Sequence, residues 1–115
     1  MKASLIYDFE YTVNLPDNRK LTVSMDLYRI DAIEAPLDYP EGYKFSWIAF
    51  NPDNNLERVL VDCHKGKGPH FHIDEEGQGI SFEWTSLDDA MELFAKKVKD
   101  RFDVDIMPSL FGDEE

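Results

Sequence analysis

All three histidines of the chain fall in one short stretch, as His64, His70 and His72. Histidine ionises near neutral pH, and it is both a common general acid or base and a common metal ligand. Cys63 precedes the stretch and Asp74 follows it. If the protein carries out chemistry, the sequence places that chemistry in residues 63–74, here called the histidine segment.

A strand conformation would give part of this segment a polar face. On a strand His70, His72 and Asp74 point to one side, and the apolar residues between them point to the other. Matching apolar residues across the following turn predicts a register in which opposed side chains lie about 5 Å apart at Cβ. In that register the expected pairs are Ile73 with Ile80, Phe71 with Phe82, His72 with Ser81, and His70 with Glu83.

The preceding strand is expected to add two polar groups to the same face. Val59, Val61 and Cys63 alternate with Asp62 and His64, so the two polar residues share the side opposite the apolar ones. The three histidines then converge with several carboxylates, provided that the register does not slip by one residue. Because adjacent residues point to opposite faces, Cys63 is not placed to act as a nucleophile with His64, and it is expected to be a small buried residue.

Three interpretations of the histidine segment are open. In the first, histidines act as acid and base in phosphodiester cleavage, while Lys65 or Lys67 and glycine-flanked amides bind the charged group. The catalytic residues would be His64, His70, His72, Asp62 and Glu83.

In the second interpretation, His70 and His72 bind a metal ion, and Asp74 or His64 completes the ligand shell. In the third, the segment is a solvated face of a hairpin whose glycines only let the loop turn. A short His-x-His motif does not decide among these interpretations, and the sequence identifies no cofactor.

Periodicity predicts the elements that position the segment. Apolar and polar residues alternate in 5–13 and again in 21–27, and the turn-forming run 15–18 between them indicates a hairpin. Further strands are expected at 43–50, 58–63, 70–74 and 79–84.

One helix is expected after the strands. Ser86 and Asp89 resemble a capping box, and an apolar stripe with helical spacing continues to Phe102. The predicted fold is α+β, a curved antiparallel sheet of about six strands with this C-terminal amphipathic helix on one face. Residues 1–102 form a single domain in this prediction. Residues 103–115 form an acidic tail, for which a terminal edge strand, a docking peptide and a frayed end are open, with the frayed end as the default.

Composition limits the classes of partner. The formal net charge is −12, so direct binding of nucleic acid is disfavoured, whereas a basic protein or a small cation is favoured. A single cysteine, no export signal and no long apolar stretch predict a cytoplasmic protein that is not in a membrane. An exposed sheet face rich in aromatic residues would suit a homodimer.

The run 58–74, with its Pro-His-Phe-His core, resembles the signature of TumE-type toxins of two-gene toxin–antitoxin systems. The order of elements that follows, a short hairpin and then a helix opened by Ser86-Leu87, is also similar, and the resemblance covers roughly 43–102. It implies a prokaryotic toxin whose antitoxin is encoded nearby, and a histidine-dependent ribonuclease activity. The alternative is a non-catalytic protein-interaction or metal-binding domain. Carried over by position are Asp62, His64, His70, His72 and Asp74.

Overall fold

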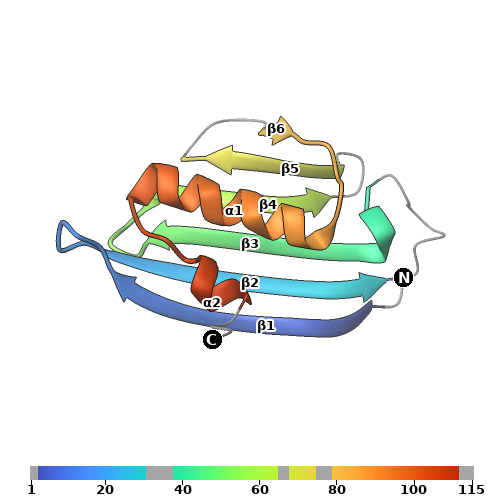
Figure 1. Cartoon of the computed structure of the whole chain (residues 1–115), viewed down its shortest axis with the longest axis horizontal. Helices are drawn as coiled ribbons and strands as arrows, with labels where there is room; N and C mark the ends of the chain where they lie inside the picture. Colours follow the sequence, from blue (N-terminus) through green and yellow to red (C-terminus); the bar gives the residue numbers. More distant parts are fainter. Residues whose placement is uncertain (1–2, 31–37, 65–67, 75–78, 112–115) are drawn as a thin grey trace.

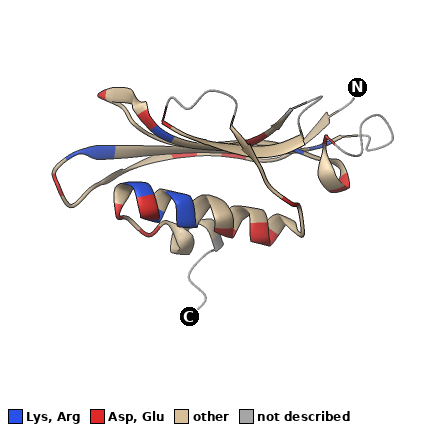
Figure 2. Cartoon of the chain, turned by 90° about the horizontal axis from the view of Figure 1, so that it is seen from above, with Lys and Arg blue, Asp and Glu red and all other residues tan. Residues whose placement is uncertain are grey.

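The computed structural model describes residues 3–30, 38–64, 68–74 and 79–111 of the chain. In these residues six strands form one open antiparallel sheet in chain order, and the helices lie on one side of it (Figures 1 and 2). This confirms the predicted α+β fold. The elements are β1 (Ala3–Asn14), β2 (Lys20–Ile30), a 3-10 turn (Pro40–Gly42), β3 (Tyr43–Asn51), β4 (Asn54–His64), β5 (Gly68–Ile73), β6 (Ile80–Ser81), α1 (Leu87–Phe102) and α2 (Met107–Phe111).

The first hairpin forms where the turn residues predict it. The backbone N–H of Leu15 donates to the carbonyl of Arg19 at 2.8 Å, and that of Asn18 donates to the carbonyl of Leu15 at 3.1 Å. Asn18 adopts a positive φ of 72°, which asparagine tolerates better than most residues. The register of the two strands shifts once, between Leu5 and Tyr7, where β1 has an irregularity of the β-bulge type.

Helix α1 begins and ends with caps. The Oγ of Ser86 accepts a hydrogen bond from the backbone N–H of Asp89 at 3.0 Å, as the capping-box pattern predicts. At the other end Asp103 adopts the left-handed conformation, and its N–H donates to the carbonyl of Lys99.

No helix in the described residues is both long and apolar enough to cross a bilayer.

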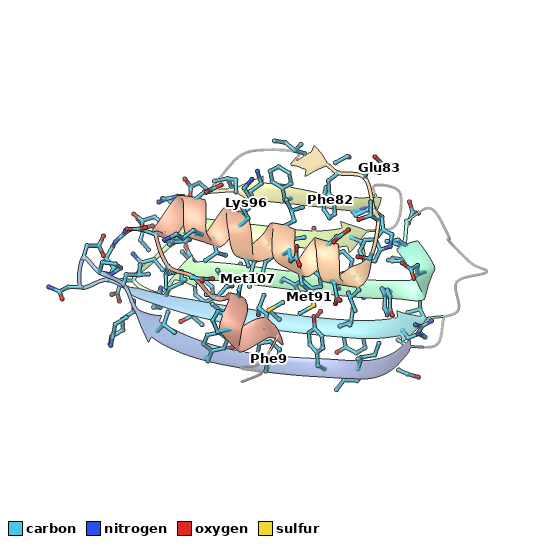
Figure 3. All side chains as sticks on the ribbon, in the orientation of Figure 1. Phe9, Phe82, Glu83, Met91, Lys96 and Met107 are labelled. Atoms are coloured by element: carbon cyan, nitrogen blue, oxygen red, sulfur yellow. The ribbon has the colours of Figure 1, made fainter. Side chains whose placement is uncertain are left out.

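The described part of the C-terminal segment is not frayed, which corrects the expectation for residues 103–111. Ile106 is only 3% exposed and belongs to the core. Met107 and Leu110 pack against the same core, as does Phe9 of β1. Figure 3 labels Met107 at the start of α2 and Phe9 on β1, where α2 lies over the first strands. The apolar residues of the segment therefore cover a part of the sheet that α1 does not reach.

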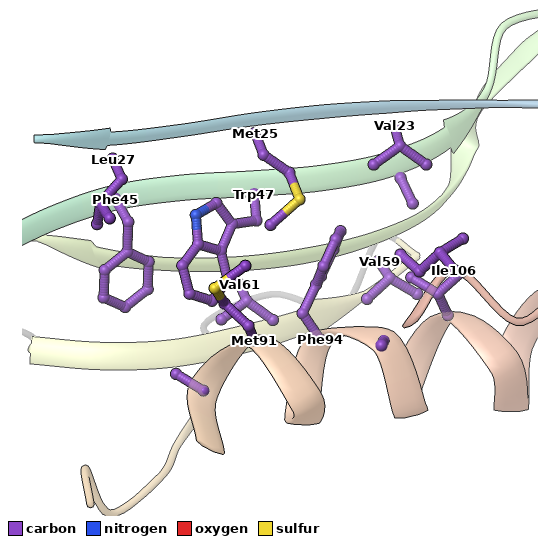
Figure 4. Close-up of a cluster of buried hydrophobic side chains, with 14 of the residues drawn as sticks. Val23, Met25, Leu27, Phe45, Trp47, Val59, Val61, Met91, Phe94 and Ile106 are labelled. Carbon is purple, nitrogen blue, oxygen red and sulfur yellow. The ribbon is translucent and has the colours of Figure 1, made fainter. Parts of the chain in front are cut away.

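The core lies between the sheet and the helices. Trp47 and Phe94 are fully buried, and their ring centroids are 6.1 Å apart. Phe45 stacks on Trp47 at 4.4 Å. Because strand residues alternate, the side chains that fill this core leave their neighbours on the opposite, open face of the sheet. Figure 4 labels Val23, Met25, Leu27, Phe45, Trp47, Val59, Val61, Met91, Phe94 and Ile106 of this core.

The last strand differs from its prediction. β6 covers Ile80–Ser81 only, and the predicted register is wrong by two residues, since Phe71 lies opposite Ile80 and not Phe82. Phe82 lies just beyond β6, where its backbone N–H still donates to the carbonyl of Pro69 at 3.3 Å, and its ring packs 6.5 Å from that of Phe71. Trp84 follows it and stacks 5.8 Å from Phe45. Packing of these two aromatic rings on the helix side takes the chain off the sheet edge and towards α1.

Candidate metal centre

Asp62 and His70 face each other on neighbouring strands. The register pairs Asp62 of β4 with His70 of β5, and Leu60 with His72. Because Val61 and Cys63 point into the core, Asp62 and the two histidines point to the open face, as predicted from the alternation. One ligand atom from each of Asp62, His70 and His72 lies within 4.8 Å of the other two.

A backbone carbonyl fixes the orientation of the His70 ring. Nδ1 of His70 lies 2.9 Å from the carbonyl oxygen of Gly68. A carbonyl oxygen only accepts hydrogen bonds, so Nδ1 carries a hydrogen and Nε2 is the nitrogen that faces Asp62. Nε2 lies 3.0 Å from Oδ1 of Asp62. The ring therefore presents a ligating nitrogen directly to a carboxylate.

His72 completes the group, and Gly79 covers it. The rings of His70 and His72 are arranged edge to face, with centroids 5.0 Å apart. Gly79 has a φ of +81°, and a Cβ there would lie 2.8 Å from Cε1 and Nε2 of His72 and 3.0 Å from Cδ2 of His70. Side chains do not fit at that distance, so the close approach of this backbone to both rings requires glycine.

The group is largely withdrawn from solvent. His70 is 1% exposed and Asp62 is 7% exposed, whereas His72 is only half-buried. Burial of a carboxylate is costly unless a positive group or hydrogen-bond donors face it. Because His72 is the most exposed member of the group, solvent and ligands approach the group from its side.

A second approach leads to Asp62 from the middle of the sheet. A hollow of about 170 Å³ on this side is lined by Asp62, Asp26, Lys44 and Ser46, among others. Burial raises the pKa of Asp26, although the backbone N–H of Ser46 donates to its Oδ1 at 2.9 Å and opposes the shift. The hollow thus places the amine of Lys44 and one further carboxylate, that of Asp26, beside the group.

The group lies in a polar row that crosses the open face. In each neighbouring pair of strands, a polar residue of one strand lies directly opposite a polar residue of the other. From β1 to β6 the row consists of Asp8, Asp26, Ser46, Asp62, His70 and Ser81.

Two acidic residues predicted at this site lie elsewhere. Glu83 is exposed and lies beyond β6, so the predicted pairing with His70 is wrong, and Ser81 occupies that position. Asp74 follows β5 with a φ of 57°, and its Oδ1 lies 3.0 Å from Nε of Arg101. Asp62 therefore takes the place in the group that the metal-binding interpretation gave to Asp74.

The remaining predicted residues are described in part or not at all. His64 ends β4 and its backbone pairs with Gly68, but its side chain lies outside the described residues. Lys65 and Lys67, expected to bind a charged group, also lie outside them. Cys63 is buried, and burial raises the pKa of its thiol to about 11. A protonated thiol is a poor nucleophile, in agreement with its predicted structural role.

The contributions of Gly68 and Gly79 to the group were missed at the level of sequence. Gly68 was expected to let the loop turn or to flank amides that bind a charged group, and Gly79 was expected to begin the last strand. A signal existed for each, because a glycine at the edge of a strand often marks a close approach of backbone to another group.

Comparison of the chain with models of protein families, with curated proteins and with solved structures finds no match.

Proposed function

We propose that this protein is a metal-binding domain in which Asp62, His70 and His72 bind a divalent transition-metal ion, with Zn²⁺ as the first candidate. The observation that carries the proposal is the contact of 3.0 Å between Nε2 of His70 and Oδ1 of Asp62. With Nδ1 directed at the carbonyl of Gly68, Nε2 is the nitrogen that faces the carboxylate. Together with His72, these two atoms form a compact set of nitrogen and oxygen ligands for a divalent cation.

The distances suit such an ion. Ligand atoms about 2.1 Å from a tetrahedral zinc ion lie about 3.4 Å from one another. The separation of 3.0 Å between Asp62 and His70 is close to this value, and the three ligand atoms all lie within 4.8 Å, so a small movement of His72 completes the arrangement. Gly68 supplies the backbone acceptor that commonly holds the second nitrogen of a metal-binding histidine.

Two histidines and one carboxylate leave room for a further ligand. Zinc sites with three protein ligands keep a fourth position for water or substrate, and the same donor set also suits iron. The half-buried side of His72 is where that position would lie. The ion would also join β4 to β5, and so stabilise the outer part of the sheet.

The burial of His70 favours metal binding over the ribonuclease hypothesis. A general acid or base has to reach the proton that it transfers, and His70 is 1% exposed. The net charge of −12 also disfavours RNA as a substrate. The TumE-type toxin function, with an antitoxin partner, stays a prediction.

Metal content of the full-length, untagged protein tests the proposal. Purified protein is dialysed against equimolar Zn²⁺, Fe²⁺, Ni²⁺ and Mn²⁺, and bound metal is measured by mass spectrometry. We expect one ion per chain in the wild type and little in the His70→Ala/His72→Ala variant. Asp62→Asn should lose most of the bound metal, and the control Asp74→Asn should keep it. Equal metal content in all four proteins would contradict the proposal.

Growth on induction provides a separate test of the toxin hypothesis. The wild type and the His70→Ala/His72→Ala variant are expressed alone from the same promoter. Toxicity that depends on the histidines would slow growth only in cells with the wild type. Equal growth would count against it without affecting the metal measurement.

A further inference from the structure

Strand β1 is a long edge of the sheet. It spans twelve residues and pairs only with β2, and no strand lies beyond it in the described part of the chain. The outer backbone groups of an edge strand can form hydrogen bonds with an added strand, which is how several peptide-binding domains work. The opposite edge, β6, has two residues and offers little such surface.

The two faces of β1 differ in chemistry. On the helix side, Tyr7, Phe9 and Tyr11 form a ladder of half-buried rings, with centroids 5.4 Å and 6.1 Å apart. These rings pack against the core on their inner side, and apolar side chains of an added strand would extend that packing outwards. On the open face, Asp8 and Glu10 are exposed.

The charges of this edge select against a second copy of the same chain. β1 contains no lysine or arginine, so antiparallel pairing with itself would bring acidic residues close to acidic residues. Asp8 already lies opposite Asp26 of β2, where it helps to raise the pKa of that carboxyl. Charges on edge strands are a common device against self-association, and they favour a partner of opposite charge.

We propose that β1 binds an extended segment of another protein as an additional strand, and that this segment alternates apolar residues with lysine or arginine. The apolar residues would pack beside Phe9 on the helix side. The basic residues would face Asp8 and Glu10 on the open face. The proposal is independent of the metal centre, which lies near the opposite edge of the sheet (Figure 1).

Fluorescence anisotropy with synthetic peptides tests the pairing. The probe is a labelled peptide as long as β1, in which lysine alternates with valine or threonine, and the control is a scrambled peptide of identical composition. We expect the alternating peptide to bind the full chain at least about tenfold more tightly at physiological ionic strength, because only its two faces match those of β1. Equal binding of the two peptides would overturn the proposal.

N-methylation of the peptide separates strand pairing from attraction between charges. In a ladder only alternate residues of the added strand direct their N–H groups to β1. Two peptides are therefore compared, each methylated at every second amide, with the methylated positions offset by one residue. The peptide methylated at the N–H groups that point to β1 should no longer bind, and the other should bind largely as before. Loss of binding by both peptides, or by neither, would overturn strand addition.

Charge reversal locates the surface. Asp8→Lys/Glu10→Lys should weaken binding of the basic peptide about tenfold and strengthen binding of a peptide with glutamate in place of lysine. Glu92→Lys/Asp100→Lys, on the exposed side of α1, makes the same change in net charge elsewhere and should have much less effect. Equal weakening by both variants would overturn the assignment to β1. Circular dichroism confirms that each variant is folded.

Two further measurements complete the test. Sedimentation of the chain alone is expected to show a monomer, and a dimer broken by the Asp8→Lys/Glu10→Lys change would make a second copy the occupant and overturn the proposal. The His70→Ala/His72→Ala variant should bind the peptide as the wild type does. Loss of peptide binding in that folded variant would contradict the independence of the two sites.

Discussion

Gly79 lies so close to His72 that a Cβ at this position would be 2.8 Å from the imidazole ring. The glycine also has a φ of +81°, a conformation that other residues adopt only with strain. The absence of a side chain at Gly79 therefore leaves the room that the His72 ring occupies, and with it the shape of the metal centre.

The change Gly79→Ala should consequently damage the metal centre. We expect metal affinity to fall by about tenfold or more, as it does when groups that orient metal ligands are removed. Titration with a competing chelator measures the affinity. Gly42→Ala is the control, because Gly42 also has a φ of +81° but lies in the 3-10 turn. It should lower the free energy of unfolding and leave metal affinity unchanged.

Removal of the metal should destabilise the wild-type protein. At a free metal concentration about one hundred times the Kd, binding adds about 2.7 kcal/mol to the free energy of unfolding. Thermal unfolding with and without a chelator measures this difference. In His70→Ala/His72→Ala the chelator should change nothing, and a wild type that is also insensitive to it would contradict a stabilising ion.

Phe94→Ala should destabilise the fold from the helix side. Phe94 is fully buried against Trp47, so its truncation leaves a cavity and should cost about 3–5 kcal/mol in the free energy of unfolding. Urea denaturation measures the loss. The exposed Glu92→Ala change in the same helix serves as the control, and should cost less than about 0.5 kcal/mol.

Cys63 should react slowly with alkylating reagents at pH 8. Burial raises the pKa of its thiol from the ordinary 9.0 to about 11 in the folded protein. The unfolded thiol therefore loses its proton first, and the stabilising contribution of the protonated, buried form is lost as pH rises from about 9 to about 11. Alkylation rates in buffer and in urea provide the measurement. Equal rates in both would show that the thiol is accessible in the folded chain.

Most of the fold could be predicted because its signals are local. Alternation of apolar residues marks the long strands, and Ser86 with Asp89 marks the start of α1. The register of the last hairpin was wrong by two residues. An even shift keeps every side chain on its face, so His70 and His72 still point to the open face with Asp62.

The details of the site could be predicted only in part, because they depend on contacts between distant segments. Asp74 shares its strand parity with the histidines, but a positive φ and an ion pair with Arg101 of α1 hold it outside the group. The rings of Phe82 and Trp84 determine where β6 ends, through packing that alternation alone does not reveal. The close approach of Gly79 to His72 depends on the register of β6 and on the positive φ of the glycine.

The order of the strands has a consequence for how the chain folds. Each strand pairs with its neighbours in sequence, from β1 to β6, so the sheet grows without a crossover connection. Contacts between residues near in sequence form faster than distant ones, because less chain entropy is lost in closing each loop. The protein should therefore fold faster than a sandwich of similar length whose strands pair out of sequence. The ligands of the metal centre come from β4 and β5, a pair that a single short connection brings together.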